Sequence, residues 1–168
     1  MISAIVTADD DPDALAATLA SLTPAAIDGL VRELIVVGGD SQSALEIAED
    51  AGARISQSQA DAVATARQPW LLLLPAGVRL QMNWEAAARG HIKRNPEAAG
   101  WFELNYARDG LRARLAEGWA NAGARWLGLV RPEHGLLVPT QRWKAGVSGR
   151  GDRPIRARIL VGGLMLGD

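Results

Sequence analysis

Apolar runs of strand length alternate with stretches of helical periodicity along the first half of the chain. Three of these runs, residues 2–7, 33–37 and 70–74, are rich in Ile, Val and Leu and have the length of β-strands. The run at 70–74 is apolar at every position, which is typical of a central parallel strand buried on both faces. Strands that alternate with helices in this way predict a sheet built from β-α-β units.

The segments between the strands carry the signals of helices. The first predicted helix follows Pro12 and presents one apolar face, and the acids at 9–11 lie near its positive end. That face is formed by Leu15, Leu19 and Leu22. The second helix follows the turn at 38–41 and ends at Gly52. Four of its apolar residues are predicted to face the sheet: Leu45, Ile47, Ala48 and Ala51.

The remaining elements are predicted from the same patterns. Strands are expected at 53–56, 100–106 and 135–138, and helices at 60–67 and 84–94. A further amphipathic helix is expected from five apolar residues at helical spacing: Leu111, Leu115, Trp119, Ala122 and Trp126. A polar loop at 150–154 precedes a last apolar segment at 155–166. No repeat or linker interrupts the pattern, so residues 1–168 are predicted to form a single domain.

Composition narrows the classes of function. The chain has 168 residues and a net charge of −1, so no overall basic field favours nucleic acid as a partner. It contains no cysteine, and only His91 and His134 could supply imidazole, which argues against a disulfide framework and a structural zinc site. No apolar run is long enough to span a bilayer, and the first residues form a strand rather than a signal segment. A cytoplasmic location is expected, with peripheral membrane contact left open.

Four motifs in a fixed order resemble a known family. They are Ile-Ser-Ala-Ile-Val-Thr at 2–7, Glu-Leu-Ile-Val-Val-Gly-Gly-Asp-Ser at 33–41, Leu-Leu-Leu-Leu-Pro-Ala-Gly-Val-Arg-Leu at 71–80 and Glu-His-Gly-Leu-Leu-Val at 133–138. Together they resemble the short bacterial branch of the family-two glycosyltransferases, over roughly residues 1–143. The resemblance implies the GT-A fold, a Rossmann-like α/β/α sandwich with a mostly parallel sheet and an antiparallel strand from the second half. An all-parallel sheet would instead indicate an unrelated doubly wound α/β domain with a different ligand.

The resemblance implies a nucleotide-sugar site at the ends of the first two strands. There the family contacts the nucleoside, which corresponds here to Thr7, Asp9, Gly38 and Asp40. The family's acid at the end of the second strand falls on Gly38, so a carboxylate contact to the base would have to come from Asp40. The favoured alternative for Asp40 is an N-cap of the second helix.

The end of the strand at 70–74 departs from the family. It reads Pro75-Ala76-Gly77 where the family carries Asp-x-Asp, the acids that hold a divalent metal against the diphosphate. A Mn²⁺ or Mg²⁺ cofactor is therefore not expected. Arg67 or Arg79 could take over the role of the metal through a guanidinium–phosphate pair, and ordinary solvated surface arginine is the alternative for both.

A catalytic base is also harder to find than in the family. Glu133 and His134 fall on the family's Asp-Gln positions and form the only acid–histidine neighbours in the chain. Glu133 is the candidate base, although neighbouring residues of a strand point to opposite faces. The stretch around 151–158, where the family carries an acidic pair, contains Asp152 followed by arginines.

Six tryptophans suggest a carbohydrate surface, because indole rings stack on sugars. Trp70, Trp119 and Trp126 are predicted to lie in the core. Trp84, Trp101 and Trp143 lie at element edges and are the candidates for an acceptor surface. The amphipathic helix is predicted to pack on its own sheet, with an anionic membrane or a second subunit as alternatives.

Two functions of different class follow. The first is a family-two-like glycosyltransferase that binds a nucleotide-diphosphate sugar and works without metal. The second is a non-catalytic GT-A-like domain that acts through binding, as a homodimer or as the partner of a competent enzyme.

Overall fold

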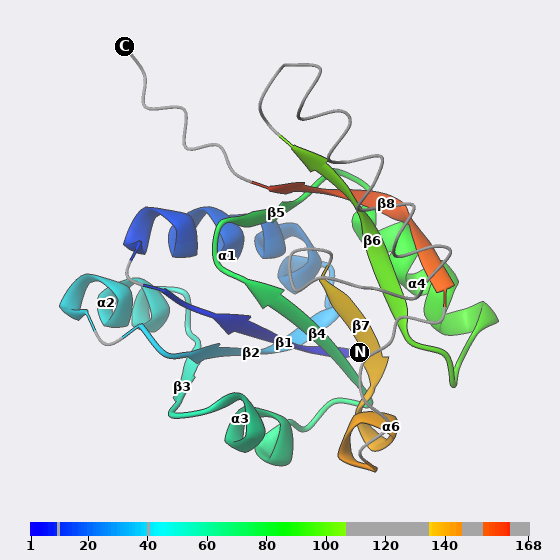
Figure 1. Ribbon diagram of the computed structural model, residues 1–168, viewed down its shortest axis with the longest axis horizontal. Coiled ribbons are helices and arrows are strands. Elements are labelled where there is room, and N and C mark those ends of the chain that lie inside the picture. Colours follow the sequence, from blue (N-terminus) through cyan, green and yellow to red (C-terminus); the bar gives the residue numbers. More distant parts are fainter. Residues whose placement is uncertain (10, 40, 107–134, 146–152, 162–168) are drawn as a thin grey trace.

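Three parallel strands in register form the centre of the computed structural model: β1 (Ile2–Thr7), β2 (Val31–Val37) and β4 (Trp70–Pro75). The structure describes residues 1–9, 11–39, 41–106, 135–145 and 153–161 (Figure 1). β1 lies between the other two strands, and Thr7 is level with both Val37 and Pro75. The last residues of the three strands therefore meet at one edge of the sheet.

Helices connect these strands, as the apolar periodicity predicts. α1 (Pro12–Ile27) links β1 to β2, and α2 (Gln42–Asp50) links β2 to the short edge strand β3 (Arg54–Ser56). α3 (Gln59–Thr65) leads into β4. Each helix returns the chain to the end of the sheet where the next parallel strand begins. α1 and α2 pack on one face of the sheet and α3 on the other.

The second half of the described chain extends the sheet. β5 (Val78–Leu80) follows β4 after a turn, and α4 (Trp84–Arg94) precedes β6 (Gly100–Tyr106). β7 (Leu136–Pro139), α6 (Thr140–Lys144) and β8 (Arg153–Val161) complete the described elements. Within the described ranges the sheet has eight strands in the order β3-β2-β1-β4-β7-β6-β8-β5.

The sheet is mixed. β7 is antiparallel to both β4 and β6, and β5 is antiparallel to β8, whereas the other neighbouring pairs are parallel. An antiparallel strand from the second half thus lies beside the central parallel strand. This arrangement confirms the predicted GT-A-like α/β fold and excludes the all-parallel alternative.

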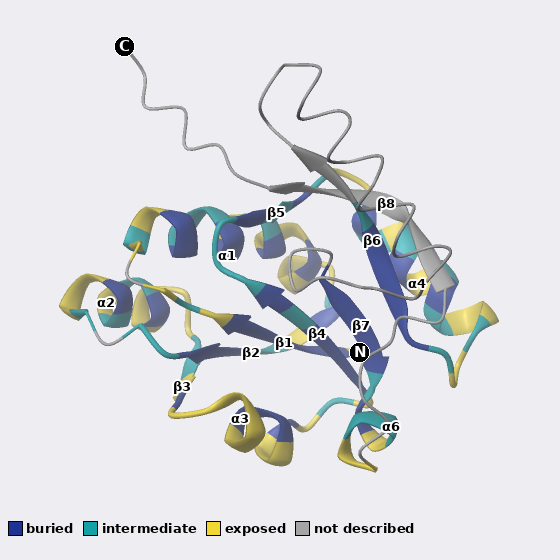
Figure 2. Ribbon diagram, viewed as in Figure 1, coloured by how far each residue is buried: buried dark blue, intermediate teal, exposed yellow. Residues whose placement is uncertain are grey.

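Side chains of β4 alternate between two cores. Leu72 and Leu74 pack with buried residues of α1, α2 and α4, while Leu71 packs with α3 and β7 on the other face. Trp70, Leu71, Leu72 and Leu74 are all buried, as predicted for a central strand covered on both faces. Figure 2 shows the buried strands between helices whose outer sides are exposed.

Most element bounds agree with the sequence prediction, and several details differ. In α2, Ala44 and Ala48 are buried but Ala51 is exposed, because the helix ends at Asp50 and Ala51 lies beyond its packed face. The predicted polar loop at 150–154 is wrong for its last two residues, which begin β8. α6 has no counterpart in the prediction. The amphipathic helix predicted at 111–126 lies outside the described residues.

Candidate functional site

The carboxyl ends of β1, β2 and β4 are joined by backbone hydrogen bonds beyond the strands themselves. The N–H of Ala8 donates to the carbonyl of Val37 at 2.8 Å, and the N–H of Ala76 donates to the carbonyl of Thr7 at 2.8 Å. These bonds hold the three turns that follow the strands against one another. Ligands of open α/β sheets bind at this kind of edge, outside the carboxyl ends of the strands.

Two glycines shape the turn after β2. Gly38 and Gly39 have φ values of +78° and +75°, a conformation that favours glycine. A Cβ on Gly39 would lie 2.9 Å from the Cβ of Ala8 and 3.1 Å from that of Ala44, and a Cβ on Gly38 would lie 3.2 Å from the Ala8 carbonyl oxygen. The turn therefore lies directly against the residue that follows β1, and its surface there is largely backbone.

Side chains at this edge cap the helices that begin there. The Asp11 carboxylate accepts hydrogen bonds from the N–H groups of Asp13 and Ala14, both at 3.1 Å. At α2 the cap is Ser41, whose hydroxyl accepts from the N–H of Ala44 at 3.2 Å. Ser41 thus takes the N-cap role that the sequence analysis favoured for Asp40. Asp40 itself lies outside the described residues.

The turn Pro75-Ala76-Gly77 is fixed by its neighbours. Besides the bond from Ala76 to Thr7, the N–H of Gly77 donates to the carbonyl of Ala14 at 3.1 Å, and Gly77 has a φ of +82°. The turn therefore connects β4 to both β1 and α1. It offers backbone atoms and no carboxylate to a ligand.

The described residues at this edge do not fit a divalent metal. Such an ion needs several hard oxygen ligands. The described turns provide two carboxylates, the exposed Asp9 and Asp11, and Asp11 already caps α1. Asp9 also accepts a hydrogen bond from the N–H of Asp11 at 3.2 Å. Within the described ranges there is no group of three His, Asp or Glu residues that could hold a metal.

Arg67 is not at this edge. It lies between α3 and β4, at the amino end of the strand, and its side chain is 80% exposed. Gln68, Pro69 and the six residues of β4 lie between Arg67 and Ala76, and β4 alone spans about 20 Å along the sheet. Its backbone N–H donates to Glu33 at 2.9 Å. The structure therefore separates Arg67 from Thr7, Gly38 and Ala76, which it brings together.

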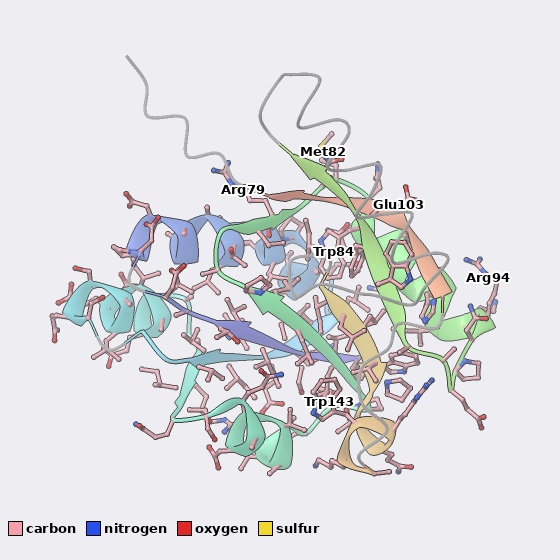
Figure 3. The ribbon with its side chains drawn as sticks, in the orientation of Figure 1. Arg79, Met82, Trp84, Arg94, Glu103 and Trp143 are labelled. Atoms are coloured by element: carbon pink, nitrogen blue, oxygen red, sulfur yellow. The ribbon has the colours of Figure 1, made fainter. Side chains whose placement is uncertain are left out.

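Arg79 lies two residues beyond the Pro75-Ala76-Gly77 turn, in β5. Val78 and Leu80 on either side of it are buried, and the Arg79 side chain points away from that core (Figure 3). Glu133 and His134 lie outside the described residues, as does Asp152. The described residues Gly135 and Leu136 bring the chain into β7, and Leu136 pairs with Leu73 near the carboxyl end of β4.

The prediction of an acceptor surface is wrong for two of its three tryptophans. Trp84 and Trp101 are each 1% exposed, and Trp84 makes an edge contact with Phe102 in the core. Trp84 is the first residue of α4 and Trp101 the second of β6, and both already point into the core. Trp143 is half-buried and packs against the core on the α3 side. Trp70 is buried, as predicted, and Trp119 and Trp126 lie outside the described residues.

A polar cluster at the amino edge was missed by sequence reasoning. The Glu33 carboxylate accepts hydrogen bonds from the Ser3 hydroxyl, the Arg67 N–H and the Arg54 guanidinium, and Arg54 also donates to Thr65 at 2.7 Å. Burial alone would raise the pKa of Glu33. The hydrogen bonds from Arg67, Ser3 and Arg54 and the charge of Arg54 outweigh it and lower the pKa below its ordinary value.

This cluster is structural. It joins β1, β2, β3 and the segment that leads into β4, and both oxygens of its carboxylate already accept hydrogen bonds. One signal in the sequence could have indicated this cluster. Glu33 alternates with Ile35 and Val37, so a charged residue lies on the same face of β2 as two buried residues that pack on α3.

The fold and the joined carboxyl-edge turns define a GT-A-like α/β domain. No family model matches the chain, and no curated protein matches it. Solved structures with this fold are similar to it. The glucosyl-3-phosphoglycerate synthase of Mycobacterium tuberculosis, in complex with phosphoglyceric acid, superposes with a TM-score of 0.58 at 18% identity, over 84% of this chain and 57% of the synthase.

Two other solved structures are similar over more of the chain. S. aureus TarS 1–349 has a TM-score of 0.66 at 11% identity, over 96% of this chain and 60% of TarS. A mycobacterial protein has a TM-score of 0.54 at 16% identity, over 96% of this chain and 65% of its own. The chain thus spans less than two thirds of each neighbour, and at these identities the likeness establishes the fold. Further structures of the synthase contain Mn²⁺ and UDP-glucose.

Proposed function

We propose that this chain is a glycosyltransferase-like domain that binds a nucleotide-diphosphate sugar at the carboxyl edge of its sheet. The observation that carries the proposal is the joining of the turns after β1, β2 and β4 by hydrogen bonds through Thr7, Ala8 and Ala76. The GT-A-like fold supports the proposal. The synthase of similar fold, which is 16% identical to this chain, has been crystallised with UDP-glucose. A site of this kind lies where open α/β sheets bind ligands.

The residues of this edge suggest how the nucleotide would be held. Thr7 and Asp9 supply an exposed hydroxyl and an exposed carboxylate that can accept hydrogen bonds from a base or ribose. Gly38 lets a ligand approach the backbone closely, and Ala76 offers backbone at the diphosphate side. Arg79, two residues beyond the turn, is the candidate partner for the diphosphate. Asp40 and Glu133 stay candidates from the sequence alone.

We further propose that binding does not depend on a divalent metal. A diphosphate leaving group gains negative charge as the bond between the anomeric carbon and the phosphate oxygen breaks, and carboxylate-held metal normally neutralises it. The turn Pro75-Ala76-Gly77 has no such carboxylate. This observation also favours the second candidate function, a domain that binds the nucleotide sugar without transferring it.

The first experiment is a thermal-shift titration of the purified chain against UDP-, GDP-, TDP- and CMP-sugars, each with and without Mn²⁺. A ligand at about 100 times its Kd should stabilise the fold by about 2.7 kcal/mol and raise Tm by several degrees. The proposal expects one nucleotide to raise Tm equally with and without Mn²⁺. No shift for any of the four would overturn nucleotide-sugar binding, and a shift only with Mn²⁺ would overturn metal independence.

A variant makes the metal argument sharper. Ala76→Asp places a carboxylate at the end of β4, and Ala76→Asn is the matched control of the same shape without the charge. We expect Mn²⁺ to increase the ligand-induced shift of the Asp variant and to leave that of the Asn variant unchanged. Equal responses of the two variants would show that the end of β4 does not face the diphosphate.

Measuring the reaction products distinguishes a domain that transfers the sugar from one that only binds the nucleotide sugar. With a nucleotide sugar that raises Tm, release of the free nucleotide over hours (UDP, GDP or TDP, or CMP from a CMP-sugar) indicates cleavage of the sugar–phosphate bond, by water or by an added acceptor. If Glu133 is the base, Glu133→Gln should abolish that release and retain the thermal shift. A thermal shift without any release favours the binding domain.

A further inference from the structure

An apolar groove lies on the outer side of the sheet between α1 and α2. It has a volume of about 640 Å³, and Val31 and Leu34 of β2 are among the residues that line it. Ala16, Ala20 and Ile27 line its α1 side and Ile47 its α2 side. None of the carboxyl-edge residues Thr7, Gly38 or Ala76 lines it, so the groove is separate from the proposed nucleotide site.

The outer face of α1 beside the groove is unusual for an exposed helix. Asp13 is the only charged residue between Pro12 and Ile27, whereas exposed helix faces normally carry several charges. Ile27 at the end of the helix is 84% exposed. A large aliphatic side chain projecting next to an apolar groove is typical of a surface that another protein covers.

Two charged residues of opposite sign line the groove. Arg32 and Asp50 both line it, and neither forms a salt bridge within the part of the chain that the structure describes. The Arg32 side chain only donates to the Gly29 carbonyl, at 3.1 Å. α2 ends in Glu49 and Asp50 with no basic residue in its last turn, so the negative end of the helix carries uncompensated acids.

We infer that this groove is the interface for a second copy of the chain. The surface is complementary to itself. It contains both a protruding Ile27 and a hollow that can receive one, and both an acid, Asp50, and a base, Arg32, that form no salt bridge with any other described residue. In a two-fold symmetric dimer each copy presents the same patch, so a contact from one residue to another occurs twice. Ile27 of each copy enters the groove of the other, and Arg32 of each faces Asp50 of the other.

Sedimentation velocity of the purified chain, without any nucleotide, tests this directly over about 1–100 µM. The inference expects a monomer–dimer equilibrium, and Ile27→Asp should raise the dimer Kd at least about tenfold by placing a charge in the apolar hollow. Met82→Asp is the matched control, because Met82 is 92% exposed and lies away from the groove (Figure 3). Circular dichroism melts of each variant establish that both remain folded.

Charge reversal tests the orientation of the two copies. Arg32→Asp and Asp50→Arg should each weaken the dimer, and the chain carrying both substitutions should recover it, since the pair is restored with reversed sign. A chain that stays monomeric at the highest concentration overturns the inference. So does a dimer that Ile27→Asp leaves intact or that Met82→Asp weakens as much. A dimer that the double substitution fails to restore overturns the pairing of Arg32 with Asp50.

Discussion

The backbone N–H of Arg67 donates a hydrogen bond of 2.9 Å to the carboxylate of Glu33, which lies 34 positions earlier in the chain. The same carboxylate accepts from Ser3 of β1 and from Arg54 of β3. Three strands and the segment that leads into the central strand therefore share one acceptor. The amino edge of the sheet thus has this side-chain cluster in addition to backbone bonds, whereas backbone bonds join the turns at the carboxyl edge.

Replacing Glu33 by Gln should destabilise the fold by about 1–3 kcal/mol, because it removes the charge and turns one acceptor into a donor that faces the Arg67 N–H or the Ser3 hydroxyl. Urea denaturation measures the change in the free energy of unfolding. Glu49→Gln, at an exposed position of α2, is the control and should be as stable as the parent or slightly more stable. Equal denaturation midpoints for Glu33→Gln and the parent would contradict a structural role for the cluster.

The contribution of Glu33 should also depend on pH in a defined direction. Its pKa is lower in the folded protein than in the unfolded chain, so the unfolded chain binds more protons as the pH falls, and acid favours unfolding. The stabilisation is fully present above the unfolded pKa, about 4.3, and is lost as the pH falls through the folded value. The difference in unfolding free energy between the parent and Glu33→Gln should be constant near neutral pH and shrink below about pH 4. A difference that stays constant to pH 3 would show that the carboxylate charge is not its source.

Much of the fold could be predicted because the apolar pattern of each element is local. α4 and β6 have the predicted bounds, and the continuous apolar run of β4 identified the strand with a core on both faces. The order of strands in the sheet is a different kind of information. The resemblance to a family implied only an antiparallel strand from the second half, which β7 beside β4 confirms, and no local pattern predicted the order itself.

The failures involve contacts between residues far apart in sequence. Trp84 and Trp101 were placed at element edges, where the pattern cannot show that one of the first two residues of a helix or strand already points into the core. Arg67 was one candidate for the diphosphate, with a solvated surface arginine as the alternative, and its side chain is exposed at the edge opposite the carboxyl end of the central strand. The Glu33 cluster combines four distant segments, which no local pattern predicts.

The close approach of Gly39 to Ala8 predicts a difference between two glycines of similar conformation. Gly39 and Gly52 have φ values of +75° and +66°, so alanine at either position should cost about 1–2 kcal/mol for the left-handed backbone. A Cβ at Gly52 meets nothing within 4 Å, whereas one at Gly39 would lie 2.9 Å from the Ala8 side chain. Gly39→Ala should therefore cost about 1–3 kcal/mol more than Gly52→Ala, as overpacking does. Urea denaturation of the pair gives the comparison, and equal costs would mean that the turn after β2 can move away from β1.

Trp84 offers a test of what an unpaired polar group costs in this core. Its indole N–H is buried and has no hydrogen-bond partner within the described part of the molecule. Trp84→Phe removes some packing volume, which destabilises, and also removes the unpaired donor, which relieves a penalty of about 1–3 kcal/mol. The two effects should nearly cancel.

Trp101→Phe is the matched control for this substitution. Trp101 is equally buried at 1% exposure, and it is not without a partner in its surroundings, whereas the indole N–H of Trp84 has no hydrogen-bond partner among the described residues. The same loss of volume there has no compensating gain, so Trp101→Phe should destabilise more than Trp84→Phe, by about 1 kcal/mol or more. Urea denaturation followed by circular dichroism is the appropriate measurement, because tryptophan fluorescence changes with the substitution itself. If Trp84→Phe proves as costly as Trp101→Phe, the indole N–H of Trp84 is satisfied in solution, and the interior beside Phe102 contains an acceptor for it.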